Sequence, residues 1–118
     1  MLHLLLHLLV PALVAWWLVH RAPPHAATQA GPGGVLKAFG RTWLLLLLGW
    51  LIDVDHLLAD PIYAPGRCSI GFHPLHTAPA IAAYAGLTLW RPTRLFGIGL
   101  LIHVGLDAMD CVWMHHTG

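Results

Sequence analysis

Hydrophobic residues form four long blocks along this chain, separated by short segments with proline, glycine and polar residues. The blocks cover about residues 2–19, 35–58, 74–90 and 93–113. A bilayer core of about 30 Å is crossed by roughly 20 helical residues, so each block has about the length of a transmembrane helix. Their continuous leucine runs lack the alternation of a membrane β-barrel strand. The pattern predicts an all-α integral membrane bundle of about four transmembrane helices, forming a single domain over residues 1–118.

The basic residues predict how this bundle is oriented. Arg21 follows the first apolar block instead of preceding it, which argues against a signal peptide. Five of the six Lys and Arg residues lie around the first and third connections: Arg21, Lys37, Arg41, Arg91 and Arg94. Arg67 is alone on the opposite side. Because positive residues stay in the cytoplasm, we expect an inner-membrane protein of bacterial type with both termini in the periplasm.

The composition supports lipid as the main solvent and limits the partners. Hydrophobic residues make up 58% of the 118 residues and charged residues 9%, far below the roughly 25% charged residues of a soluble domain. A net charge of +1 with scattered Lys and Arg predicts no nucleic-acid partner. We expect membrane lipid as the main partner, and a homodimer is compatible with the short helices.

The remaining polar residues are mainly histidine and aspartate, and most of them map to the predicted periplasmic end. That end receives His3, His7, Asp53, Asp55, His56, Asp60, His73, His76, His103, Asp107 and Asp110. Ionisable groups at membrane depth usually face the bundle interior and mark a function. Imidazole and carboxylate ligands together suit zinc, with iron or manganese as alternatives. The set exceeds one tetrahedral site, so two or more ions are expected.

Helical geometry predicts which of these residues share a face. At about 100° per residue, positions three or four apart lie on one side of an α-helix. Asp53, His56 and Asp60 would then share a face, whereas Asp55 would point elsewhere in a regular helix.

Each residue also has an ordinary interpretation. His3 and His7 suit a headgroup layer, Asp60 before Pro61 suits a turn, and Asp110 suits a helix cap. Four further histidines are interpreted as solvated or interfacial: His20, His25, His115 and His116. For the set as a whole, the alternative to metal binding is a structural hydrogen-bond network, which is an expensive way to hold apolar helices together.

Cys68 and Cys111 fit no CxxC pattern, so thiolate metal clusters are disfavoured. Both map to the predicted periplasmic side, where disulfides form and persist. We predict a Cys68–Cys111 disulfide beside the site, with two free buried thiols as the alternative.

Three motifs occur in a fixed order after an early histidine: Asp53–His56, Phe72–Thr77 and His103–Asp107. In this order they resemble bacterial inner-membrane metal-dependent hydrolases of the YdjM-like type, related to zinc-dependent phospholipase C, over roughly residues 3–110. The chain is most similar to a small four-helix branch of these proteins. The resemblance implies metal ligands or acid–base groups at Asp53, Asp55, His56, His73, His76, His103 and Asp107. It departs at His73, because two residues instead of three separate it from His76.

The expected function is therefore a zinc-dependent hydrolase acting on a lipid or lipid-linked phosphoester, or another ester, at the periplasmic leaflet. Water bound to zinc has a lowered pKa and serves as the nucleophile in such enzymes. Asp53 or Asp55 is the expected general base, His3 and His7 would complete the ligand set, and Arg67 would bind a phosphate.

The sequence is compatible with two other functions. The spacings His3-x-x-x-His7 and His73-x-x-His76 and the pair His115-His116 resemble the histidine boxes of membrane di-iron oxidases and hydroxylases. A non-enzymatic metal- or haem-binding membrane protein is the other alternative.

Overall fold

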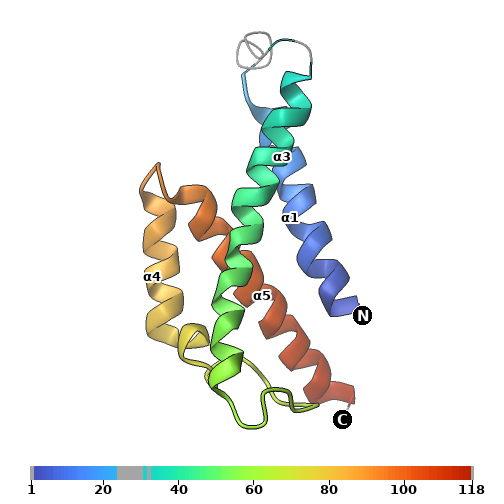
Figure 1. Ribbon diagram of the computed structural model, residues 1–118, viewed down its shortest axis with the longest axis vertical. Coiled ribbons are helices and arrows are strands. Elements are labelled where there is room, and N and C mark those ends of the chain that lie inside the picture. The colour runs from blue at the N-terminus through green and yellow to red at the C-terminus, as the bar shows by residue number, and fades with distance from the viewer. Residues whose placement is uncertain (1, 24–30, 32, 118) are drawn as a thin grey trace.

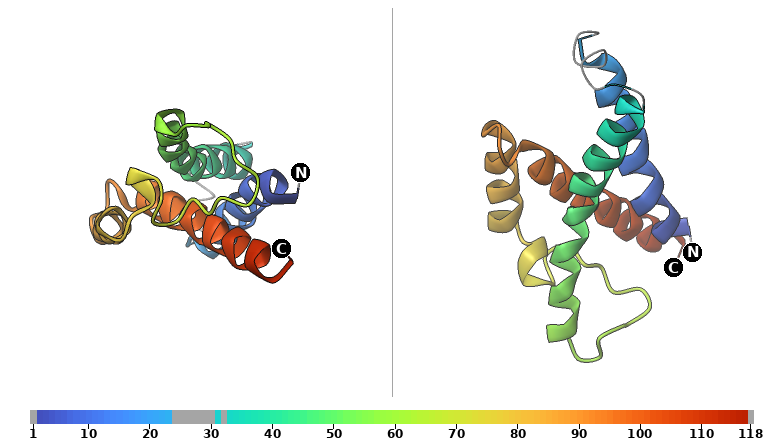
Figure 2. Two further views of the ribbon diagram at one scale, coloured as in Figure 1. Left: turned by 90° about the horizontal axis from the view of Figure 1, so that it is seen from below. Right: turned by 45° about the horizontal axis from the view of Figure 1, so that its top comes forward.

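A computed structural model describes residues 2–23, 31 and 33–117 of the chain. The described residues form α-helices and 3₁₀ segments without any β-strand. The elements in chain order are α1 (Leu2–Arg21), α3 (Gly34–Leu47), η1 (Leu48–Leu58), η2 (Pro74–His76), α4 (Ala78–Leu89) and α5 (Arg94–Thr117). α1 pairs with α3, α4 pairs with α5, and α5 crosses the first pair obliquely (Figures 1 and 2).

Three of the four predicted apolar helices have the expected length. Leu2–Arg21, Gly34–Leu58 (α3 continued by η1) and Arg94–Thr117 are long and apolar enough to cross a membrane. Their boundaries lie within four residues of those predicted. The all-helical architecture and the three long apolar segments are therefore confirmed.

The prediction of one helix over residues 74–90 is wrong. His73 is extended, as a residue before proline prefers, and Pro74 opens the short η2 turn. Thr77 is extended again, so α4 begins only at Ala78 and has 12 residues. At 1.5 Å per residue it is about 18 Å long, well short of a hydrocarbon core of about 30 Å.

The η1 segment changes which side chains face the bundle. A 3₁₀-helix has three residues per turn, so every third residue shares a face. Leu46, Gly49, Ile52 and Asp55 are accordingly all buried. The neighbouring row is half-buried and contains Leu47, Trp50, Asp53 and His56; the third row is exposed and contains Leu48, Leu51, Val54 and Leu57. The expectation that Asp55 points away from the site therefore fails, because the regular α-helix on which it depended ends at Leu47.

Two glycines, Gly49 at the start of η1 and Gly99 in α5, allow α5 to cross the junction of α3 and η1 at backbone contact. A Cβ atom on Gly49 would lie 2.5 Å from the carbonyl oxygen of Gly99, and one on Gly99 would overlap the backbone of Leu46. Small residues at such crossings are a recurrent device of closely packed apolar helices. This crossing lies one turn from His103 along α5, so it fixes the distance between the polar residues of η1 and those of α5.

One end of the bundle collects four chain segments. The start of α1, the end of η1, the η2 turn and the end of α5 all lie there, as do both ends of the described chain (Figure 1). The end of α1 and the start of α3 lie at the opposite end (Figure 1).

Candidate metal centre

Nine histidines and aspartates from α1, η1, η2 and α5 form three donor groups at this end of the bundle. Within each group, one nitrogen or oxygen atom per residue lies within 4.8 Å of every other. We call them the first, second and third donor groups, and each is described below.

The first donor group comprises Asp53, His76, His103 and Asp107. Asp53 Oδ1 lies 3.0 Å from His103 Nε2 and 3.7 Å from His76 Nε2. Asp107 Oδ2 lies 3.1 Å from His76 Nε2 and 3.6 Å from His103 Nε2. Zinc bonds of about 2.0–2.1 Å put neighbouring donors of a tetrahedron roughly 3.3 Å apart. The four measured separations scatter around that value, so these atoms can bind one ion with small adjustments.

The second donor group comprises His3, His7 and Asp107. Asp107 Oδ1 lies 3.4 Å from His3 Nε2 and 3.3 Å from His7 Nε2. Asp107 thus offers one oxygen to this group and the other to the first group. Three protein donors leave a coordination position open, as in catalytic zinc sites.

The third donor group comprises Asp55, His56 and His73. Asp55 Oδ1 lies 3.3 Å from His56 Nδ1 and 3.9 Å from His73 Nδ1. The two imidazole rings are stacked with centroids 3.9 Å apart. Burial, followed by the charge of His56, lowers the pKa of His73. His73 is therefore more readily the neutral imidazole that binds a metal.

Other hydrogen bonds orient several of these ligands. Asp55 Oδ2 accepts a hydrogen bond from the backbone N–H of Leu75 at 2.8 Å and lies 3.2 Å from His76 Nδ1. His7 Nδ1 lies 3.0 Å from the carbonyl oxygen of His3, and His56 Nε2 lies 3.3 Å from Ser69 Oγ. In each of these three histidines, one ring nitrogen has such a partner and the other faces a donor group. Ligands of protein metal sites are oriented in this way.

Unpartnered buried atoms test whether the residues fit a metal. Buried polar atoms nearly always have hydrogen-bond partners, so an exception needs an explanation. Four atoms that face the donor groups lack such a partner among the described residues: His7 Nε2, Asp55 Oδ1, His56 Nδ1 and His76 Nε2. These four atoms approach carboxylate oxygens or ring nitrogens without hydrogen-bond geometry, as expected if both face a shared cation, whereas His103 Nε2 and Asp53 Oδ1 are hydrogen-bonded at 3.0 Å. The donor set fits divalent metal ions.

His103 departs from this pattern. Its Nε2 faces the first donor group, yet its buried Nδ1 has no hydrogen-bond partner in the part of the chain that the structure describes. His103 is held by the 3.0 Å hydrogen bond between its Nε2 and Asp53 Oδ1 and by packing, since its ring centroid lies 4.6 Å from that of His7 and 5.7 Å from that of His76.

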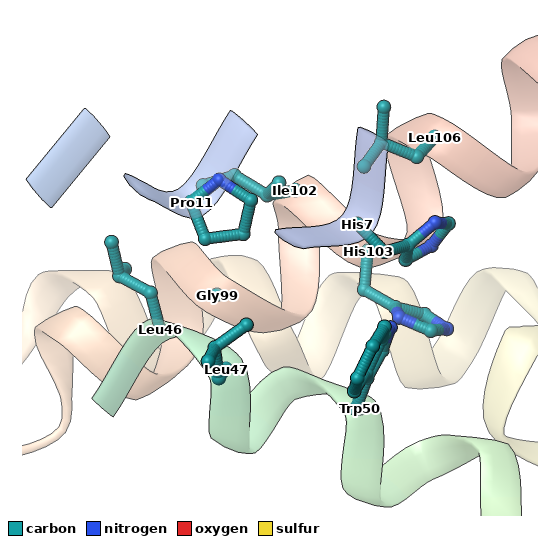
Figure 3. Close-up of a pocket in the computed structure, with 9 residues that line it drawn as sticks. All are labelled: His7, Pro11, Leu46, Leu47, Trp50, Gly99, Ile102, His103 and Leu106. Atoms are coloured by element: carbon teal, nitrogen blue, oxygen red, sulfur yellow. The ribbon is translucent and has the colours of Figure 1, made fainter. Parts of the chain in front are cut away.

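One side of the site, next to His7 and His103, is mostly apolar. A small cavity of about 10 Å³ lies between α1, α3 with η1, and α5. His7, His103 and Trp50 lie at one end of it, and Pro11, Leu46 and Leu47 lie toward the other (Figure 3). This volume admits about one water molecule, so this side of the donor groups is largely closed to solvent.

The opposite side opens into a larger, more polar cavity of about 350 Å³. His3, His56 and His73 line it, so it reaches the second and third donor groups. Arg67 and Asp110 line it as well. Ligand pockets have volumes of about 300–1,000 Å³, so this cavity can hold a small polar group beside the donors.

Arg67 also holds the loop that covers this cavity. Its Nη2 donates hydrogen bonds to the carbonyl oxygens of Pro61 at 2.8 Å and Ile62 at 2.9 Å, and its guanidinium stacks over Phe72. The predicted role in binding phosphate stays a prediction.

The same loop is tied to α5 by the Cys68–Cys111 disulfide, which confirms that prediction. The two Cα atoms are 5.0 Å apart. Cys68 lies between Arg67 and Ser69, which both line the polar cavity, so the disulfide fixes the wall of the site.

The structure brings together all nine residues predicted as catalytic groups or principal ligands. Asp110, a predicted additional ligand, lies outside the three groups, 3.8 Å from His3 Nδ1. Asp60 is exposed and also lies outside the three groups. The helical face that it was predicted to share with Asp53 and His56 does not form, because η1 ends at Leu58. His20, His115 and His116 are exposed and separate from the groups, as predicted. His25 lies outside the described residues.

Two contributions to the site were missed in the sequence. Ser69 and the backbone N–H of Leu75 position His56 and Asp55. Ser69 lies four residues before His73, a proximity that could have drawn attention to it. The Leu75 contact depends on the η2 turn, and Pro74 is the only residue whose type indicates that turn.

These observations define the class of the protein: a helical bundle with three long apolar helices and a buried histidine–aspartate centre at one end. Residues 36–114 match DUF6122, a family of unknown function, and the chain belongs to this family. The matched range contains the first and third donor groups and both cysteines, whereas His3 and His7 precede it. No curated protein and no solved structure matches the chain.

Proposed function

We propose that this protein is a metal-dependent hydrolase embedded in the bacterial inner membrane, with its centre at the periplasmic leaflet. The substrate would be a lipid or lipid-linked phosphoester, or another ester. One observation carries the proposal: three adjoining donor groups contain buried atoms that lack hydrogen-bond partners among the described residues, and two of these groups border a polar cavity.

The exposed surface supports the membrane setting. Large apolar side chains are exposed along all of the long helices, including Leu13 at 65%, Leu51 at 61% and Val112 at 58%. A soluble monomer rarely exposes large contiguous apolar patches. The helices that carry these side chains are long enough to cross a bilayer.

The donor chemistry favours zinc over the other ions. All donors are imidazole nitrogens and carboxylate oxygens, a set that also accepts iron or manganese. Four donors in the first group and three in the second suit the coordination of zinc. Asp107, with one oxygen toward the first group and one toward the second, would help to hold an ion in each of them, and paired ions are a recurrent arrangement in hydrolases. Such ions supply electrostatic stabilisation and lower the pKa of water.

The chain's own residues supply the remaining chemistry. Asp53 is the better of the two predicted general bases, because its side chain is 45% exposed whereas Asp55 is buried and its Oδ2 already accepts the backbone N–H of Leu75. Asp55 instead orients His76 through Nδ1. Arg67 places a positive charge on the wall of the polar cavity, where it would attract an anionic substrate.

The hydrolytic step itself is supported by the resemblance of the three motifs to YdjM-like hydrolases. The structure adds that these motifs converge, since Asp53–His56, Phe72–Thr77 and His103–Asp107 all contribute to the donor groups.

Elemental analysis of the purified full-length protein tests the proposal. We expect two to three zinc ions per chain in the wild type and a clear loss in the double variant His56→Ala/His103→Ala, which removes a ligand from two groups. The matched control is His115→Ala/His116→Ala, which removes two exposed histidines from the last turn of α5.

Activity is measured on a chromogenic phosphodiester and a fluorogenic phospholipid. Chelation should abolish turnover and added zinc should restore it. Full metal content in His56→Ala/His103→Ala would refute the metal centre. Stoichiometric iron would favour the oxidase interpretation, and a Soret band would favour haem binding.

A further inference from the structure

An apolar groove of about 500 Å³ lies between the start of α1 and the end of α5. Its apolar lining consists of Leu2, Leu6, Leu106, Met109 and Trp113. From Leu106 to Trp113 it follows α5 for about 10 Å. Three of these side chains are more than 60% exposed (Leu2, Met109 and Trp113).

The groove ends at the metal centre. His3 and Asp110 line it and also line the polar cavity, so the two spaces share a boundary. His3 belongs to the second donor group through its 3.4 Å approach to Asp107 Oδ1. The apolar groove therefore leads to the second donor group, which offers three protein donors.

We infer that this groove binds one acyl chain of a membrane phospholipid and places its phosphoester in the polar cavity. This inference rests on the proposed function, because it names the substrate's binding mode at the same centre. The lipid would enter sideways from the bilayer between α1 and α5.

The shape and chemistry of the groove favour an acyl chain over other occupants. Its lining is aliphatic, thioether and aromatic, which suits a flexible hydrocarbon chain. Polar groups are confined to the end at His3 and Asp110, next to Arg67 on the cavity wall. This order matches an amphiphile with one anionic end. A helix from a second copy would meet ionisable side chains at this end without a matching anionic group.

Native mass spectrometry of the intact protein in mild detergent tests the inference. The probe is palmitoyl lysophosphatidylglycerol, compared with monopalmitoylglycerol and inorganic phosphate. We expect one lysophospholipid per wild-type chain and weaker retention of the two comparison compounds, since each lacks half of the recognised chemistry. Met109→Trp should fill the groove and lower the lipid-bound fraction about tenfold.

Leu9→Trp is the matched control. It places the same side chain on an exposed position of α1 outside the groove and should retain the probe. Trp113→Ala removes part of the wall by truncation and should also weaken binding. Circular dichroism of each variant establishes that it is folded.

The inference is overturned if the wild type retains no probe, or if Met109→Trp and Leu9→Trp retain it equally. A dimer that disappears in Met109→Trp, in place of a lipid adduct, would assign the groove to a second copy. The assay requires no turnover. Lipid binding without metal would therefore refute the proposed function alone, whereas hydrolysis of soluble phosphodiester without lipid binding would refute the groove alone.

Discussion

Asp107 occupies a special position among the residues of the centre. Its two oxygens face different donor groups, at 3.1 Å from His76 and 3.3 Å from His7, and the side chain is only 4% exposed. A buried carboxylate between several imidazoles is stable only if it is paired or bound to a metal. The two groups therefore depend on one another through this residue.

Replacing Asp107 by Asn should remove the ions proposed for the first and second donor groups. The amide keeps the shape of the side chain, but it loses the negative charge and one acceptor oxygen, so it cannot bridge two cations. The third group does not contain Asp107, so it should retain its ion. Elemental analysis of Asp107→Asn, with zinc added during purification, measures this loss.

Asp110→Asn is the control for this experiment. It makes the same change three residues further along α5, at a half-exposed position outside the donor groups. It should keep the full metal content. Equal metal content in the two variants would contradict the bridging role of Asp107.

At the scale of elements, the helices were predictable because long apolar blocks and the His and Asp positions at their ends are local properties of the sequence. The path of η1 was not. A regular α-helix would have excluded Asp55 and included Asp60, whereas the 3₁₀ geometry after Leu47 buries Asp55 and exposes Val54 and Leu57. The choice between these two helix geometries depends on packing against α5. This packing cannot be predicted from the local sequence of residues 48–58 alone.

The η2 turn and the loop before it show the same limit. The sequence predicted one helix from residue 74, with His73 and His76 at its start, and did not predict that these two histidines would reach different donor groups. Their placement depends on non-local contacts, including the 2.8 Å hydrogen bond from Tyr84 to the carbonyl oxygen of Leu75 and the disulfide to α5. The disulfide was predictable, because topology placed both cysteines at the same end.

The glycine crossing of α3 and α5 gives a prediction at this scale. Gly99→Ala would place a methyl group on the Leu46 backbone. Overpacking of this kind typically costs about 1–3 kcal/mol, and it should also separate Asp53 from His103. We expect a lower melting temperature and weaker zinc binding, measured by thermal unfolding in detergent and by zinc titration.

Gly105→Ala is the matched control, since a Cβ atom there would have no neighbour within 4 Å. It replaces glycine within the same helix, where alanine is favoured by up to about 1 kcal/mol. Its melting temperature should be unchanged or higher. A similar loss of stability in both variants would show that the crossing is not responsible.

At the scale of the whole molecule, basic residues and donor groups separate toward opposite ends. Arg21, Lys37 and Arg41 lie at the end of α1 and the start of α3, and the α4–α5 turn carries two more arginines. The donor groups lie at the other end, where Arg67 is the one Lys or Arg among the described residues. The positive-inside rule would then place the metal centre in the periplasm, where the disulfide would also be stable.

Reporter fusions to the full chain test this orientation. Alkaline phosphatase fused after the last residue should be active and green fluorescent protein at the same site should be dark, since the former requires the periplasm and the latter the cytoplasm. Insertions at the Arg91–Pro92 turn should give the reverse result. Replacing the three basic residues near the first connection by Gln should produce a mixed orientation, because the charge difference falls from five against one to two against one. If the reporters place the Arg91–Pro92 turn in the periplasm, the predicted topology is overturned. The candidate metal centre would then face the cytoplasm, where thiols are kept reduced.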